Sequence, residues 1–179
     1  MNKLKYFVMM VALFIGSATM AQTTLKIGHM DMQYVLSTMP EMKQVQSQLQ
    51  TLQSQLEKQA AAKQKEFEEK YNRYVNEGSQ MADAVRMDLE KDLTQMQQSA
   101  QEFASNAQKT LQQKESQLMQ PIYDKIGTAI NDVAKEGGYS YIINAGVPGL
   151  DVLYYADSTM DVSNAVLKKM GIDPPAASN

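Results

Sequence analysis

Side chains that could carry out chemistry are few in this sequence and far apart. The only histidine, His29, lies in a run of strand-forming residues without an adjacent group to orient it as a base. The chain has no cysteine, so it offers neither a thiol nucleophile nor a Cys/His zinc site. Neighbouring acids such as Glu68 and Glu69 point apart on a helix, and no phosphate-binding glycine motif occurs. The sequence therefore predicts a protein that is not an enzyme and uses no cofactor.

The amino terminus has the three parts of a secretory signal peptide. Two lysines provide positive charge, residues 6–15 are apolar, and small residues lead up to Ala21. The apolar run is much shorter than the roughly 20 residues of a membrane-spanning helix, which favours cleavage over anchoring. We expect residues 1–21 to be removed, with cleavage after Ala18 as the alternative, and the mature protein to be exported.

The charge of the mature chain argues against one class of partner. The 17 basic residues less the two lysines of the signal peptide leave 15, against 20 acidic residues, a formal charge of −5. Nucleic acids and acidic lipid surfaces are bound by basic patches. The sequence therefore predicts no nucleic-acid partner.

A long helical hairpin is predicted for the middle of the chain. Residues 41–77 contain no glycine or proline, and their apolar side chains recur at alternating intervals of three and four, at Met42, Val45, Leu49, Leu52 and Leu56. This is the seam spacing of a coiled coil. A second helical stripe runs from Met81 to Leu111, and Gly78-Ser79 between the two indicates a chain reversal. We expect an antiparallel hairpin over residues 41–119 with its turn near 78–79.

The seam of the first helix is interrupted. Gln59 and Lys63 stand where apolar residues would continue it, and three alanines, Ala60 to Ala62, lie alongside. A seam without large apolar side chains holds two helices together less tightly, so we expect the hairpin to bend there.

Short strand-forming runs flank the hairpin on both sides. Residues 25–31, 139–144 and 152–155 are rich in β-forming residues, whereas 122–133 and 161–170 have helical periodicity. The expected fold is α+β and mostly α, a long antiparallel coiled-coil hairpin inserted into a small β body.

In this division, the first strand lies in residues 22–40 and the rest of the β body in residues 120–172, while residues 173–179 form a disordered tail. Three short strands make a weak core by themselves. We therefore expect other copies of the chain to complete the body. The candidates for this oligomerisation body are Ile27, Met30, Tyr141, Ile142, Ile143, Leu153 and Tyr154.

Several short motifs, taken in order, resemble a known family. They are Ile27-Gly-His-Met-Asp31, Val35-Leu36, Met39-Pro-Glu41, Tyr141-Ile-Ile-Asn144, Leu153-Tyr-Tyr-Ala-Asp157, Met160-Asp-Val-Ser163 and Val166-Leu167. Their order and spacing are similar to those of the OmpH/Skp family of periplasmic chaperones. The resemblance implies a periplasmic homotrimer in which a β body carries three hairpins, like tentacles around a cavity. That cavity holds unfolded outer-membrane proteins without ATP, and the family has no catalytic residues.

One property departs from the family pattern. The best-known members are strongly basic, which suits contact with acidic lipid and lipopolysaccharide. This chain is acidic, with a sequence pI of about 5.2. We therefore do not expect membrane or lipopolysaccharide contact.

Flexible and aromatic side chains in the hairpin are the candidates for client contact. Ten of the 14 methionines follow Ala21, and methionine suits surfaces that accept many partners. Met87 and Met119 lie off the seam and are the stronger candidates. The others follow the seam spacing, so packing between the two helices is the alternative role for Phe67, Tyr71, Tyr74 and Met81. A structural coiled-coil spacer of the cell envelope, without client binding, is the competing function.

Overall fold

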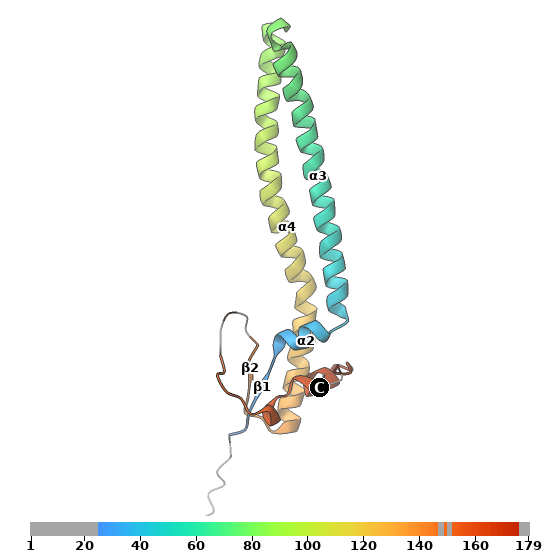
Figure 1. Cartoon of the computed structure of the whole chain (residues 1–179), viewed down its shortest axis with the longest axis vertical. Helices are drawn as coiled ribbons and strands as arrows, with labels where there is room; N and C mark the ends of the chain where they lie inside the picture. Colours follow the sequence, from blue (N-terminus) through green and yellow to red (C-terminus); the bar gives the residue numbers. More distant parts are fainter. Residues whose placement is uncertain (1–24, 147–148, 150–151, 176–179) are drawn as a thin grey trace, which may run out of the picture.

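A long two-helix shaft stands on a small body in the computed structural model (Figure 1). The structure describes residues 25–146, 149 and 152–175. The predicted signal peptide and most of the predicted tail lie outside these residues.

The shaft consists of two antiparallel helices. Helix α3 spans Glu41–Glu77, a 3₁₀ turn spans Gly78–Gln80, and α4 spans Asp83–Gly137. At 1.5 Å per residue, the 37 residues of α3 extend over about 56 Å. The prediction of long helices packed together in a mostly helical α+β fold is confirmed.

Helix α4 continues from the shaft into the body without a break. Its 55 residues include Pro121, at which the sequence pattern changes. Proline lacks the N–H that would bond the carbonyl of Gln117, four residues earlier. Gln117 is exposed, so water can satisfy that carbonyl, and the apolar stripe from Ile122 to Val133 packs in the body. The stripe is therefore a continuation of the hairpin helix.

Two strands from opposite ends of the chain form the sheet. Strand β1, Ile27–Met30, pairs in parallel with β2, Tyr141–Asn144, and Ile27 lies opposite Tyr141. The whole shaft and the short helix α2, Met32–Thr38, lie between them in sequence. The pairing of β1 with β2 therefore holds together the two ends of the segment that forms the shaft.

The expected strand at residues 152–155 is absent from the described part of the chain. These residues have no strand conformation, and Tyr154 and Tyr155 are 94% and 86% exposed. On the far side of β1 from β2, a single bridge joins His29 to Asp161 instead. A strand requires a neighbouring strand edge, and the sequence shows the β-forming residues but not whether an edge is within reach.

One apolar core joins the base of the shaft to the body. Its buried members come from β1, from α2 and the residue after it, from the lower parts of α3 and α4, and from the start and body of α5, which spans Ser163–Lys169. They include Met30, Val35, Met39, Ile126, Val166 and Leu167.

A buried hydroxyl fixes the start of α5 to the end of β1. Ser163 is 3% exposed; its Oγ accepts the Asp31 N–H at 2.9 Å and donates to Asp161 Oδ1 at 2.6 Å. The carboxylate of Asp31 in turn caps α2 by accepting the N–H groups of Gln33 and Tyr34.

Candidate binding surfaces

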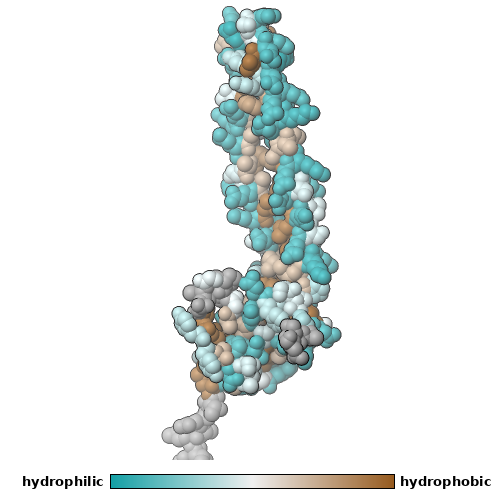
Figure 2. Space-filling model, in the orientation of Figure 1, coloured by the Kyte–Doolittle hydropathy of each residue, from teal (hydrophilic) through white to brown (hydrophobic). Residues whose placement is uncertain are grey.

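The seam of the shaft is open to solvent along most of its length. No side chain is fully buried in the described residues 46–77 of α3 or 94–121 of α4. Figure 2 shows the result as a broken line of apolar residues between hydrophilic flanks along the shaft. Apolar surface that remains exposed in the folded chain is available to a partner.

The candidates on the seam spacing divide into two groups. Phe67, Tyr74 and Met81 are half-buried, whereas Tyr71 is exposed. The Tyr71 ring stacks on Phe67, with centroids 5.9 Å apart and an angle of 12° between the planes. Tyr71 therefore presents an aromatic face outside the seam.

Tyr74 also links the two helices near the tip. Its hydroxyl donates to Glu90 Oε1 at 2.8 Å. This hydrogen bond, together with the charge of the carboxylate, raises the pKa of Tyr74 because both favour the protonated phenol.

Of the two candidates off the seam, only Met87 is freely accessible. Its side chain is 66% exposed near the tip of the shaft. Met119 is half-buried and packs against the core at the base of the shaft. Val75 and Val85 are also exposed near the tip, and neither was among the candidates. Val75 lies outside the helical stripe, whereas Val85 belongs to the second stripe and was therefore expected to pack in the seam.

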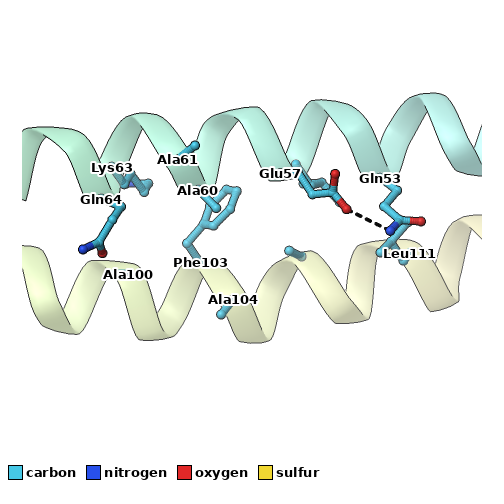
Figure 3. Close-up of a pocket in the computed structure, with 12 residues that line it drawn as sticks. Gln53, Glu57, Ala60, Ala61, Lys63, Gln64, Ala100, Phe103, Ala104 and Leu111 are labelled. Atoms are coloured by element: carbon cyan, nitrogen blue, oxygen red, sulfur yellow. Dashed lines mark hydrogen bonds between the residues drawn. The ribbon is translucent and has the colours of Figure 1, made fainter.

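A groove between α3 and α4 lies at the interrupted part of the seam. It has a volume of about 540 Å³, and its walls come from residues 53–64 and 100–111. Apolar side chains form most of the lining: Leu56, Ala60, Ala61, Ala100, Phe103, Ala104, Ala107 and Leu111. Phe103 points from α4 toward Ala60 of α3 (Figure 3). Small residues on both helices leave the space that large seam residues would fill.

Polar groups stand at the two ends of this groove. Lys63 Nζ donates to Ser99 Oγ at 3.2 Å and lies 5.7 Å from the centroid of the Phe103 ring. Toward the body, Gln53 Nε2 donates to Glu57 Oε1 at 2.8 Å (Figure 3). The groove therefore has a cation at one end and an anion at the other.

The body carries a second exposed apolar surface. Among the oligomerisation candidates, Ile27, Tyr141 and Tyr154 are exposed, and Ile142, Ile143 and Leu153 are half-buried. Met30 is buried within the core of its own chain. Leu25 and Tyr155 are exposed as well and were not among the candidates. Tyr155 follows Tyr154 directly, and this second tyrosine beside a candidate is the sequence signal that could have identified it.

The arrangement around His29 is structural. Its Nε2 lies 3.1 Å from the carbonyl oxygen of Asp157. The Thr159 N–H and hydroxyl bond the Asp157 carboxylate and lower its pKa, because they stabilise the charged form.

Within the described residues, no group of three His, Cys, Asp or Glu side chains could hold a metal ion. Nor does any described helix have an apolar stretch long enough to span a bilayer.

Comparisons with known proteins identify relatives of this fold. The family model for OmpH-like outer membrane proteins matches residues 26–170. No curated protein sequence matches the chain significantly. A crystal structure from Caulobacter crescentus, described as an OmpH-like outer membrane chaperone, superposes with a TM-score of 0.69. The two chains are 14% identical, and the match covers 82% of this chain and 83% of the other. At that identity the structural likeness concerns the fold.

Proposed function

Because this chain belongs to the OmpH-like family of outer membrane protein chaperones, whose members are periplasmic and not enzymes, we propose that it is an ATP-independent holding chaperone. It binds unfolded outer-membrane proteins in the periplasm and prevents their aggregation. The signal peptide at residues 1–21 directs its export.

The open seam of the shaft is the observation that carries this proposal. Along this projecting element, about 56 Å long, apolar and aromatic side chains stay partly exposed, and only Val45 and Leu93 among them are buried. An unfolded polypeptide is long and exposes apolar side chains at many places. A long surface with many weak sites suits such a client better than one deep pocket does.

In the half of the shaft nearer the body, polar but mostly uncharged walls flank the seam. Residues 44–56 of α3 contain no charged side chain, and residues 94–113 of α4 contain only Glu102 and Lys109. Six glutamines contribute to the α3 wall: Gln44, Gln46, Gln48, Gln50, Gln53 and Gln55. Such walls keep the shaft hydrophilic without repelling client segments of either charge.

The holding activity needs no fuel. A protein that binds the unfolded client lowers the concentration of free unfolded chains by mass action, and aggregation slows accordingly. Weak individual contacts allow the client to leave when a tighter or irreversible folding step competes for it.

The working form is a homotrimer assembled through the body. The exposed apolar residues around the sheet, Ile27, Tyr141 and Tyr154 above all, support this proposal. Buried against neighbouring copies, they would contribute about 25 cal/mol per Å² of apolar surface removed from water. Three shafts then surround one client. The acidic charge of the chain disfavours lipopolysaccharide and acidic membranes as partners.

Light scattering of an unfolded outer-membrane β-barrel protein, diluted from urea without ATP, tests the function. The mature protein should suppress aggregation at about three chains per client. Unchanged scattering, with the protein folded and oligomeric, would contradict the holding function and support the alternative of a structural coiled-coil spacer.

A further inference from the structure

We propose that the groove between α3 and α4, lined by Ala60, Phe103 and their neighbours, binds aromatic side chains of an extended unfolded polypeptide. This inference rests on the proposed holding function and assigns a specific site and a side-chain preference to it. The occupant is thus a client segment, and neither another copy of this chain nor a small metabolite.

The lining of the groove is mostly apolar. Alanines on both helices, with Leu56 and Leu111 toward the body, give walls that are apolar and shallow. The groove has a volume of about 540 Å³, which lies within the range of known ligand pockets. Moving apolar side chains from water into this space lowers the free energy, because their apolar surface is buried.

The groove is long enough to take several side chains of one extended segment. The α3 wall from Gln53 to Gln64 extends over about 16 Å at 1.5 Å per residue. In an extended chain, side chains on the same face recur about every 6.7 Å. The groove therefore receives two or three alternate side chains. Strands of membrane β-barrels alternate apolar and polar residues in this way.

Charge complementarity in the groove selects aromatic over aliphatic side chains. Lys63 Nζ is held by Ser99 above the Phe103 ring at a distance of 5.7 Å. An aromatic ring that stacks beside Phe103 presents its electron-rich face to the same ammonium group. A leucine in that place fills the volume but gains nothing from the cation.

The rim of the groove can bond the backbone of the client segment. Its alternate, polar side chains face solvent, and its backbone passes the rim, where the side-chain amides of Gln53 and Gln64 each donate to a neighbouring carboxylate. Their amide oxygens remain able to accept N–H groups from an extended backbone. The rim therefore suits a polypeptide.

Filling the groove provides the test, with a matched control on the same helix. Ala60→Leu places a larger side chain in the groove, while Ala62→Leu makes the same change at an exposed position outside its lining. Both variants are made in the mature full-length chain. Each is assayed for suppression of β-barrel protein aggregation and for binding two labelled peptides, one alternating tyrosine with serine and one alternating leucine with serine.

The expected result is a specific loss. Ala60→Leu should weaken tyrosine-peptide binding by about tenfold, since the burial of one large apolar side chain is lost, and should raise the thermal midpoint. Ala62→Leu should bind as the wild type does. Equal tyrosine-peptide binding and aggregation suppression by Ala60→Leu and wild type would overturn the groove but leave the holding function intact. A wild type that suppresses no aggregation would overturn both. A change of oligomeric state in Ala60→Leu alone would assign the groove to another copy of the chain and overturn the client site.

Discussion

Lys63 of α3 and Phe103 of α4 face each other across the hairpin, with the ammonium nitrogen 5.7 Å from the ring centroid. Both side chains are half-buried, and they occupy the stretch of seam where neighbouring positions carry alanine. A cation over a ring joins the two helices weakly while leaving space beside it. The pair therefore combines a modest structural contact with a site that remains open.

Replacing the cation while keeping its aliphatic stem separates these two roles. We predict that Lys63→Met reduces the preference for the tyrosine peptide over the leucine peptide by about two- to fivefold, because a cation–π contact contributes about 0.5–1 kcal/mol. Affinity for the leucine peptide should change little. Fluorescence anisotropy with both peptides measures this ratio, and an unchanged ratio would show that the ammonium group does not select the ring.

The exposed methionine near the tip should contribute to holding without supporting the fold. Met87→Gln keeps a similar length and a good helix former, but it removes an adaptable apolar contact. We predict weaker suppression of aggregation together with a free energy of unfolding within about 0.5 kcal/mol of the wild type, as for other surface changes. Light scattering and urea denaturation measure the two quantities. Unchanged suppression would remove Met87 from the contact surface.

Two glycines of the body should respond in opposite ways to the same substitution. A Cβ on Gly146 would clash with Asp31 Oδ1, the atom that caps α2, whereas a Cβ on Gly127 meets nothing within 4 Å. We predict that Gly146→Ala costs about 1–2 kcal/mol through loss of the cap. Gly127→Ala, inside α4, should add about 0.5–1 kcal/mol. Urea denaturation of both variants gives the comparison, and equal midpoints would contradict the role of the cap.

The shaft could be predicted from the sequence because its signals are local. The apolar spacing and the reversal at Gly78 depend only on neighbouring residues, and α3 ends at Glu77, directly before that glycine. The strand expected at 152–155 depended instead on pairing with a distant strand, and in the described structure these residues pair with none.

The groove lies between these two cases. The sequence shows that Gln59 and Lys63 interrupt the seam. Which α4 residues face this interruption depends on how the two antiparallel helices are aligned. That alignment relates residues about 40 positions apart in the sequence. Ala100, Phe103 and Ala107 were therefore visible in the sequence as a helical stripe but not as one wall of a cavity.

An ion pair at the foot of the shaft should make stability depend on pH. Lys125 Nζ donates to Glu41 Oε1, and this bond is the main cause of a lowered pKa for Glu41. A depressed carboxyl pKa means that the contribution is fully present above the ordinary value of 4.5. It is lost as the pH falls through the lower folded-state pKa.

We therefore predict that Lys125→Met lowers the free energy of unfolding at pH 7 by about 1 kcal/mol or less, since both groups are partly exposed. The difference from the wild type should shrink as the pH falls below 4.5 and through the folded-state pKa. Lys109→Met, at an exposed position on the same helix, is the control for general charge. A difference that persists at low pH would mean that the effect of Lys125 does not come from its ion pair with Glu41.

The assembly of the body should depend on Tyr154 and not on an aromatic residue of the shaft. Tyr154 is 94% exposed within its own chain, so its ring contributes little to the monomer. We predict that Tyr154→Ser leaves the helical content unchanged but dissociates the trimer at concentrations where the wild type stays assembled. Burial of one aromatic ring against a neighbour contributes about 1.5–3 kcal/mol, and three equivalent rings weaken together. Sedimentation equilibrium measures the shift.

Tyr71→Ser serves as the control, because it removes an exposed ring from the shaft and should reduce aggregation suppression while the trimer persists. A wild-type oligomer in Tyr154→Ser would exclude this residue from the interface, and a wild type that sediments as a monomer would contradict the proposed trimer itself.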